Sequence, residues 1–91
     1  MSKRPEIEIC ERWAPGTIKR RLAYILIRRL GHWVSTQDLI DIAYAHAEDG
    51  GPLDAGGCLK AHFHQLRGEL PSGYVIDGNA WWGRRLRKVE P

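Results

Sequence analysis

The chain has 91 residues, of which 43% are hydrophobic, and this fits one small domain with a single modest core. No stretch approaches the ~18 consecutive apolar residues that a membrane-spanning helix needs. The N-terminus MSKRPEIEIC has no apolar run behind its basic residues, so we expect no secretory signal and a cytoplasmic location. Cys10 and Cys58 are therefore expected to be reduced thiols.

The net charge of +3 hides a segregation of charge along the chain. Residues 1–29 hold eight bases and three acids, a net charge of +5; residues 30–59 hold five acids and no Lys or Arg; residues 60–91 hold six bases and three acids. Such a chain can present one positive and one negative face, and a positive face suggests a polyanion as partner. Ordinary solvated surface charge explains the same composition.

Residues 1–16 are predicted to form an N-terminal arm with one short strand. The sequence EIEIC alternates apolar and charged residues, which is the period of a strand and places Ile7 and Ile9 on one face. Pro15 and Gly16 then end this segment.

A first helix is predicted over residues 17–30, with Thr17 as its N-cap. Gly31 follows it, where the end of a helix favours a left-handed residue. Apolar residues recur at the spacing of one helical face, at Ile18, Leu22, Ile25, Leu26 and Leu30.

A second helix is predicted over residues 36–47. Ser35 with Asp38 three positions later resembles a capping box. The expected buried face consists of Leu39, Ile42, Ala43, His46 and Ala47. The sequence EDGGPLDAGG, residues 48–57, is acidic and glycine-rich and is predicted to be a loop.

A third helix is predicted over residues 55–70, opened by Asp54 or a nearby glycine and ended by Pro71. Its core stripe is Leu59, Phe63, Leu66 and Leu70. GYVIDGNAWW then predicts a hairpin that turns at Asp77-Gly78-Asn79, and residues 87–91 are predicted to be a basic tail. The fold class is mainly α with a small β hairpin, in the order of a winged helix-turn-helix with three helices plus wing over residues 17–86.

From Val34 onward the sequence resembles the DNA-binding effector domain of OmpR-type response regulators. VSTQDLIDIAYA is similar to the second helix of that family, CLKAHFHQLRGEL to its recognition helix, and IDGNAWW to its wing. The resemblance implies core positions at His62 and Phe63, a family arginine at Arg67, and an inward-packing Trp81 in place of a tyrosine. Asp77 stands where the family usually has a basic residue. The resemblance implies a small bacterial or phage transcriptional regulator, acting without a receiver domain.

The third helix is predicted to carry a DNA-contacting face. Lys60, His64 and Arg67 recur at four and three residues, so they lie opposite the core stripe, with Ala61 and Gln65 beside them. Lys, Arg and Gln hydrogen-bond to base edges, and small residues permit close approach to the major groove. Predicted contacts of the wing and tail with the DNA backbone are Asn79, Arg84 and Arg85. The alternative is an ordinary solvated surface.

Other chemistries have less support in the sequence. Cys58 and His62 are four residues apart on one helical face, but no second compact pair completes the four ligands of structural zinc, so no metal is expected. No nucleophile with a nearby base stands out, so neither catalysis nor a cofactor is expected. RNA binding is disfavoured because no aromatic stacking platform is visible. The main competing hypothesis is a protein-interaction module that acts through the wing or the acidic loop 48–57, and RNA polymerase is one partner that the resemblance implies for that loop.

Overall fold

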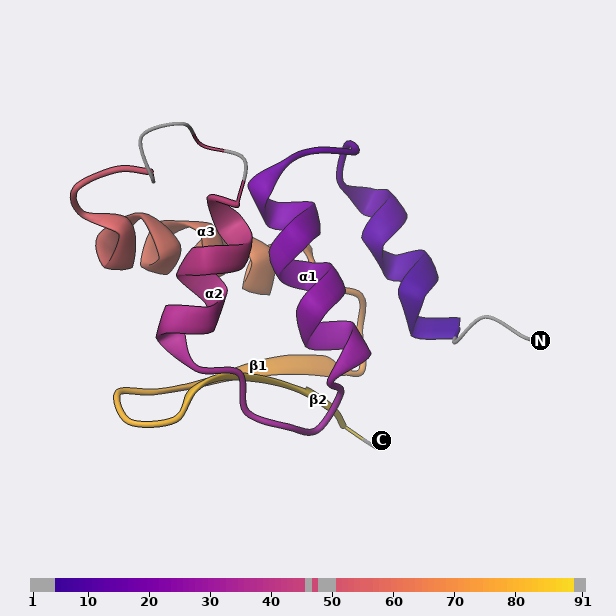
Figure 1. Ribbon diagram of the computed structural model, residues 1–91. Coiled ribbons are helices and arrows are strands. Elements are labelled where there is room, and N and C mark those ends of the chain that lie inside the picture. The colour runs from indigo at the N-terminus through magenta and orange to yellow at the C-terminus, as the bar shows by residue number, and fades with distance from the viewer. Residues whose placement is uncertain (1–4, 46, 48–50, 90–91) are drawn as a thin grey trace.

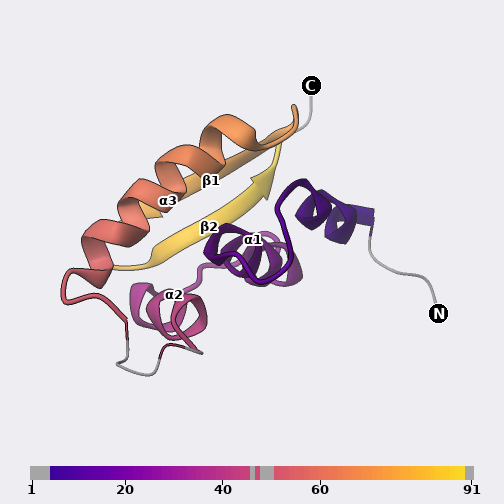
Figure 2. The ribbon, with the colours of Figure 1, turned by 90° about the horizontal axis from the view of Figure 1, so that it is seen from above.

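The computed structural model describes residues 5–45, 47 and 51–89. In these residues the elements follow in the order η1 (Pro5–Arg12), α1 (Ile18–Arg28), α2 (Thr36–Ala43), α3 (Ala55–Glu69), β1 (Tyr74–Asn79) and β2 (Gly83–Lys88). The helices α1 and α2 stand on one side of the antiparallel hairpin β1–β2 (Figure 1), and α3 runs along it (Figure 2). This mixed α/β arrangement is compatible with a winged helix. Within the described ranges, no helix has the length and apolar character needed to span a bilayer.

Local capping explains where the three α-helices begin. The side chains of Thr17, Ser35 and Asp54 accept hydrogen bonds from backbone N–H groups three residues later, at Arg20, Asp38 and Gly57. Each bond satisfies a donor that has no partner inside the helix, so the predicted helix starts are confirmed.

The predicted helix ends agree with the structure at Gly31 but not at the end of α2. Gly31 has the expected left-handed conformation, with a φ of 86°. The helix α2 ends at Ala43 instead of the predicted residue 47, because Tyr44 leaves the helical conformation after its N–H bonds to the carbonyl of Ile40. The predicted buried residue His46 lies outside the described residues.

The strand predicted near the N-terminus was wrong, because Pro5–Arg12 form the 3₁₀-helix η1. Cys10 and Trp13, which follows η1, are buried three residues apart, which is one turn of a 3₁₀-helix, while Ile7 and Ile9 are partly buried against the core. Cys10 and Trp13 are 2% and 5% exposed, so the segment belongs to the core. Ile7 and Ile9 both pack against the core, so the prediction that they face the same way is confirmed, although they lie on a helix and not on a strand.

Glu69, the last residue of α3, ties the N-terminal segment to the domain. Its two carboxylate oxygens accept hydrogen bonds from the indole N–H of Trp13 at 2.8 Å and from the Lys19 ammonium at 2.7 Å, and its carbonyl accepts one from Arg12 at 3.1 Å. The hydrogen bond from Lys19, followed by that from Trp13, holds the pKa of Glu69 below its usual value. Residues 12–19 are therefore attached to the C-terminal end of α3.

The hairpin is longer than predicted, and its turn lies further along the chain. Asp77, Gly78 and Asn79 belong to β1, and the chain turns over residues 80–82. The side-chain oxygen of Asn79 accepts hydrogen bonds from the backbone N–H groups of Trp81 and Trp82 at 2.7 and 3.0 Å, which closes the turn after Asn79. The strand β2 continues to Lys88, so the first two residues of the predicted basic tail belong to the hairpin.

The segment between α1 and α2 pairs with β2. Val34 and Arg84 exchange two backbone hydrogen bonds at 2.8 and 2.9 Å, and the N–H of Gly31 donates to the carbonyl of Leu86 at 2.9 Å. Gly83 permits this approach, since it has a φ of 100° and any β-carbon there would collide with the carbonyl oxygen of Val34. These bonds fix the orientation of the hairpin relative to α1 and α2.

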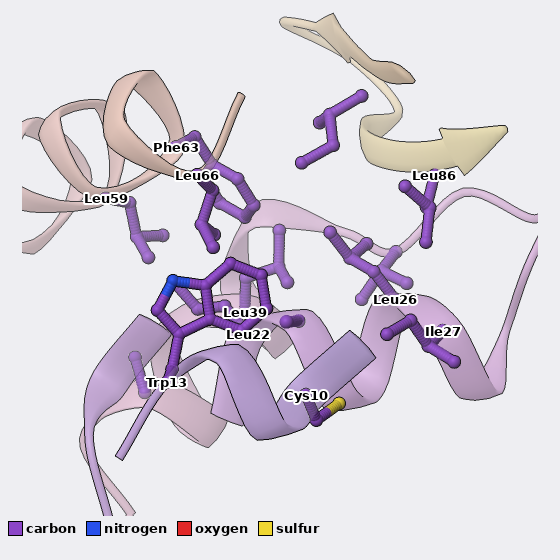
Figure 3. Packing of buried hydrophobic residues seen from close by; sticks show 14 residues of the cluster. Cys10, Trp13, Leu22, Leu26, Ile27, Leu39, Leu59, Phe63, Leu66 and Leu86 are labelled. Atoms are coloured by element: carbon purple, nitrogen blue, oxygen red, sulfur yellow. The ribbon is translucent and has the colours of Figure 1, made fainter. Parts of the chain in front are cut away.

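One core joins the elements (Figure 3). The buried hydrophobic residues are Cys10, Trp13, Leu22, Ala23, Leu26, Ile27, Val34, Leu39, Ala43, Leu59, Phe63, Leu66, Ile76 and Leu86. The predicted stripe of α3 is confirmed at Leu59, Phe63 and Leu66, while Ile25 of α1 is only partly buried and Ile27 is fully buried instead.

The prediction that Trp81 packs inward was wrong, since its side chain is 90% exposed. The inward side of the hairpin is filled by Ile76 and Leu86, which lie opposite each other in the register. Trp81 comes after the last strand pair, Asn79 with Gly83, so the alternation of a strand does not determine where it points.

Candidate nucleic-acid interface

The helix α3 presents an exposed polar face opposite its buried stripe. Lys60, Ala61, His64 and Gln65 are exposed, whereas Leu59, Phe63 and Leu66 are at most 3% exposed. Side chains of this face are free to meet a partner surface without disturbing the core. The helical period that buries every third or fourth residue produces this separation directly.

Arg67 is exposed on the same face, but it is held against the hairpin. Its Nε donates a hydrogen bond to the backbone oxygen of Ile76 in β1 at 3.3 Å. This bond directs the guanidinium of Arg67 toward the strands, away from the exposed middle of α3.

Arg84 lies between the hairpin and α3. Its guanidinium carbon is 5.2 Å from the centre of the Phe63 ring, and its Nε is buried with no hydrogen-bond partner among the described residues. Partial burial, together with the positive charge of Arg67, lowers the pKa of Arg84. A β-carbon added at Gly78 would lie 3.1 Å from Nη2 of Arg67 and 3.2 Å from Nη1 of Arg84, so the two guanidinium groups flank Gly78.

Arg85 and Arg87 share one carboxylate, that of Asp77. Oδ2 of Asp77 accepts hydrogen bonds from both arginines at 2.7 to 3.1 Å, and Oδ1 accepts a second one from Arg87 at 3.2 Å. These bonds, from Arg87 first and then Arg85, lower the pKa of Asp77 to about 2. Arg85 also stacks on the ring of Trp33 at 4.6 Å. The predicted contact residue Arg85 thus has two partners within the chain.

A groove of about 470 Å³ brings several of the predicted site residues together. It lies between the first turns of α2 and α3 and the hairpin turn, and its lining includes Thr36, Lys60, Phe63, Asn79, Ala80 and Arg84. Lys60, Asn79 and Arg84 therefore meet at one place, whereas His64, Gln65 and Arg85 do not line this groove. The side-chain oxygen of Asn79 is hydrogen-bonded to the backbone of the hairpin turn and is not a free acceptor in the groove.

The hairpin turn carries two exposed indoles, and the sequence prediction missed the placement of Trp81. Trp81 is 90% and Trp82 is 59% exposed. The signal in the sequence is Asn79, because an Asn two residues before a Trp can close a turn with its side chain and leave the aromatic residues outside the strands.

Among the described residues, the cysteines and histidines form neither a disulfide nor a metal site. Cys10 and Cys58 are not joined by a disulfide. In the part of the chain that the structure describes, no three His, Cys, Asp or Glu side chains gather in a way that would hold a metal ion. Burial, followed by the nearby thiol of Cys58, raises the pKa of Tyr44.

A comparison with models of known protein families finds no match to this chain, and a comparison with curated proteins finds none either. The resemblance to OmpR-type effector domains therefore stays a prediction from the sequence motifs.

Proposed function

We propose that this protein is a winged helix that binds double-stranded DNA sequence-specifically, with α3 in the major groove and the hairpin on the flanking backbone or minor groove. The observation that carries the proposal is the position of the exposed face of α3 beside the basic hairpin. The groove lined by Lys60 on one side and by Asn79 and Arg84 on the other joins these two surfaces. A duplex that contacts one of them therefore lies within reach of the other.

The charges of the hairpin support a polyanion as partner. β2 carries Arg84, Arg85, Arg87 and Lys88, and Asp77 is the acid on β1. Arg67 and Arg84 add two like charges on either side of Gly78. A phosphate near this pair would reduce their mutual repulsion, and each phosphate neutralised releases counterions and adds affinity that does not depend on sequence.

The proposed roles follow from exposure and position on α3. Lys60 and His64, with Ala61 and Gln65 beside them, contact base edges, because they are exposed in the first two thirds of the helix. Arg67 near the C-terminal end contacts phosphate. Asn79, Arg84 and Arg85 form the wing contact. With this activity the protein would act as a small transcriptional regulator in the cytoplasm.

A second candidate function, protein interaction, has its own observation in the exposed apolar side chains. Trp81, Trp82 and Leu53 are all exposed, and Leu53 belongs to the acidic loop 48–57, of which residues 51–57 are described. Trp is enriched in the energetically dominant residues of protein interfaces. On this hypothesis the wing or the loop binds a protein such as RNA polymerase.

Selection of bound sites from a random duplex pool, with the whole chain as bait, tests the proposal. We expect an enriched sequence motif. The logarithm of the affinity for it should fall by about 0.9 per phosphate contact for each tenfold rise in salt concentration. A matched variant carrying Lys60→Ala and His64→Ala should select no motif while still folding, since both side chains are exposed. Weak and equal binding of the wild-type protein to all duplexes would instead favour the protein-interaction hypothesis.

A further inference from the structure

The most exposed large aromatic side chain among the described residues lies at the end of the hairpin. Trp81 is 90% exposed, although an indole is one of the largest apolar groups that a core can bury. Its neighbour Trp82 is 59% exposed. Two adjacent exposed indoles at the end of a two-stranded projection indicate a surface that another molecule covers.

The turn that carries Trp81 is held in one conformation before any partner binds. The side-chain oxygen of Asn79 accepts hydrogen bonds from the backbone N–H groups of both tryptophans. At the start of β2, Gly83 lies close against the carbonyl of Val34. A tryptophan has two side-chain torsions, so little conformational freedom is lost when such a residue is buried by a partner. The turn is thus suited to insert an aromatic ring at a fixed place.

The charges near the turn favour a nucleic acid as the covering molecule. The strand that leaves the turn carries Arg84, Arg85, Arg87 and Lys88, and the groove that begins at Asn79 and Ala80 contains Lys60 of α3 on its other side. Trp81 directly follows Ala80, which lines the same groove as Lys60 and Arg84. An apolar ring next to a groove that contains two cations fits the chemistry of a nucleic acid, in which base faces lie between phosphates.

We propose that Trp81 is a wedge that enters the minor groove of the bound duplex and partly unstacks one base step. The inference rests on the proposed duplex binding by α3 and adds a contact that bends the DNA and selects for deformable sequence. Apolar wedges at base steps kink DNA in this way, and pyrimidine–purine steps unstack most easily. The DNA position that the hairpin contacts should therefore prefer a pyrimidine–purine step, even though no hydrogen bond to the bases recognises it.

The test uses the whole chain and the duplex selected from the random pool, with the fluorescent adenine analogue 2-aminopurine placed in turn at positions flanking the motif. Binding of the wild-type protein should raise the fluorescence at one step, because unstacking relieves quenching. Trp81→Ala should abolish the rise and weaken binding roughly tenfold, whereas Trp81→Phe, which keeps an aromatic ring, should retain most of both. Val75→Ala, an exposed apolar position on β1 away from the turn, is the matched control and should change neither.

The possible outcomes distinguish a failure of the proposed Trp81 wedge from a failure of the proposed duplex binding. If the wild-type protein binds the duplex with no fluorescence rise, and Trp81→Ala binds with the same affinity, the wedge is wrong and the proposed function stands. If no duplex is bound, both are wrong. If Trp81→Ala changes only the sedimentation of the free protein, a second copy of the chain covers the indole and the wedge is again wrong. Equal thermal melting of the variants and the wild type confirms that each one folds, as expected for an exposed side chain.

Discussion

The guanidinium of Arg84 lies over the ring of Phe63, 5.2 Å from its centre, and so connects β2 to α3 across the edge of the core. Phe63 is 1% exposed, so this arginine closes the core from the hairpin side. Arg84 therefore has a structural contact in addition to any phosphate that it meets, and substitutions there affect stability as well as binding.

Arg84→Lys should lower the free energy of unfolding by about 1 kcal/mol, because lysine keeps the charge and loses the planar group that stacks on the ring. Arg28→Lys is the matched control, since Arg28 stacks at 5.7 Å on Tyr24, which is 41% exposed. Urea denaturation followed by circular dichroism compares the two. A larger loss for Arg28→Lys would show that the Phe63 contact contributes no more than an exposed one.

Phe63→Ala should destabilise the domain by about 3–5 kcal/mol, because it removes a buried ring and leaves a cavity between α3 and the hairpin. This loss is close to the whole stability of a small domain. Trp81→Ala removes a larger ring from an exposed position and should leave the unfolding midpoint nearly unchanged. Melting of Phe63→Ala at the wild-type temperature would contradict the burial of this face.

Lys60→Ala and His64→Ala should each cost about 1–3 kcal/mol on a selected duplex and little on a scrambled one, as expected for lost base contacts. Arg67→Ala should weaken binding to both duplexes alike, since its guanidinium is directed toward the hairpin and is expected to meet phosphate. Paired titrations at one salt concentration distinguish the two patterns. Wild-type affinity of all three variants for both duplexes would exclude α3 as a recognition helix.

The ion pairs of Asp77 should stabilise the fold in a pH-dependent way. Its pKa is lowered from 3.8 to about 2 by Arg87 and Arg85, so the folded state favours the charged carboxylate. The stability that these pairs provide is complete above pH 3.8 and is lost as the pH falls toward 2. Asp77→Asn should therefore be less stable than wild type at neutral pH, and the difference should shrink across this interval. An equal difference near pH 2 would show that the hydrogen bonds of the charged form are not its cause.

The same substitution should strengthen DNA binding. Asp77→Asn removes the charge that pairs with Arg85 and Arg87, and both guanidinium groups become available to phosphates. We expect tighter binding to all duplexes and a salt dependence steeper by up to about two units of slope. A variant with unchanged salt dependence would place these two arginines away from the DNA.

The sequence was most informative where structure depends on neighbouring residues. Thr17, Ser35 and Asp54 mark helix starts through bonds that span three residues, and the buried stripe of α3 follows from its period alone. For the same reason the exposure of Lys60 and His64 agrees with the sequence, while their proposed contact with DNA stays a prediction.

The features that the sequence did not predict depend on contacts between distant residues. The N-terminal segment packs on α1, and the hydrogen bond from the Trp13 indole to Glu69 joins residues 56 positions apart. Arg84 meets Phe63, and Arg85 meets Trp33, only once the hairpin has docked. The placement of Trp81 depends on the hydrogen bond from its backbone N–H to the side-chain oxygen of Asn79, which a pattern of apolar and polar residues does not reveal.

The attachment of Glu69 to the N-terminal segment also gives α3 two ends of unequal local stability. The C-terminal end is held by three tertiary hydrogen bonds, whereas the helix begins with Ala55-Gly56-Gly57, and glycine is among the poorest helix formers. Amide hydrogen exchange should therefore be faster in the first turn than in the last. The end of α3 beside the hairpin turn is able to adjust to the surface it meets, while the other end keeps the helix in register with the core.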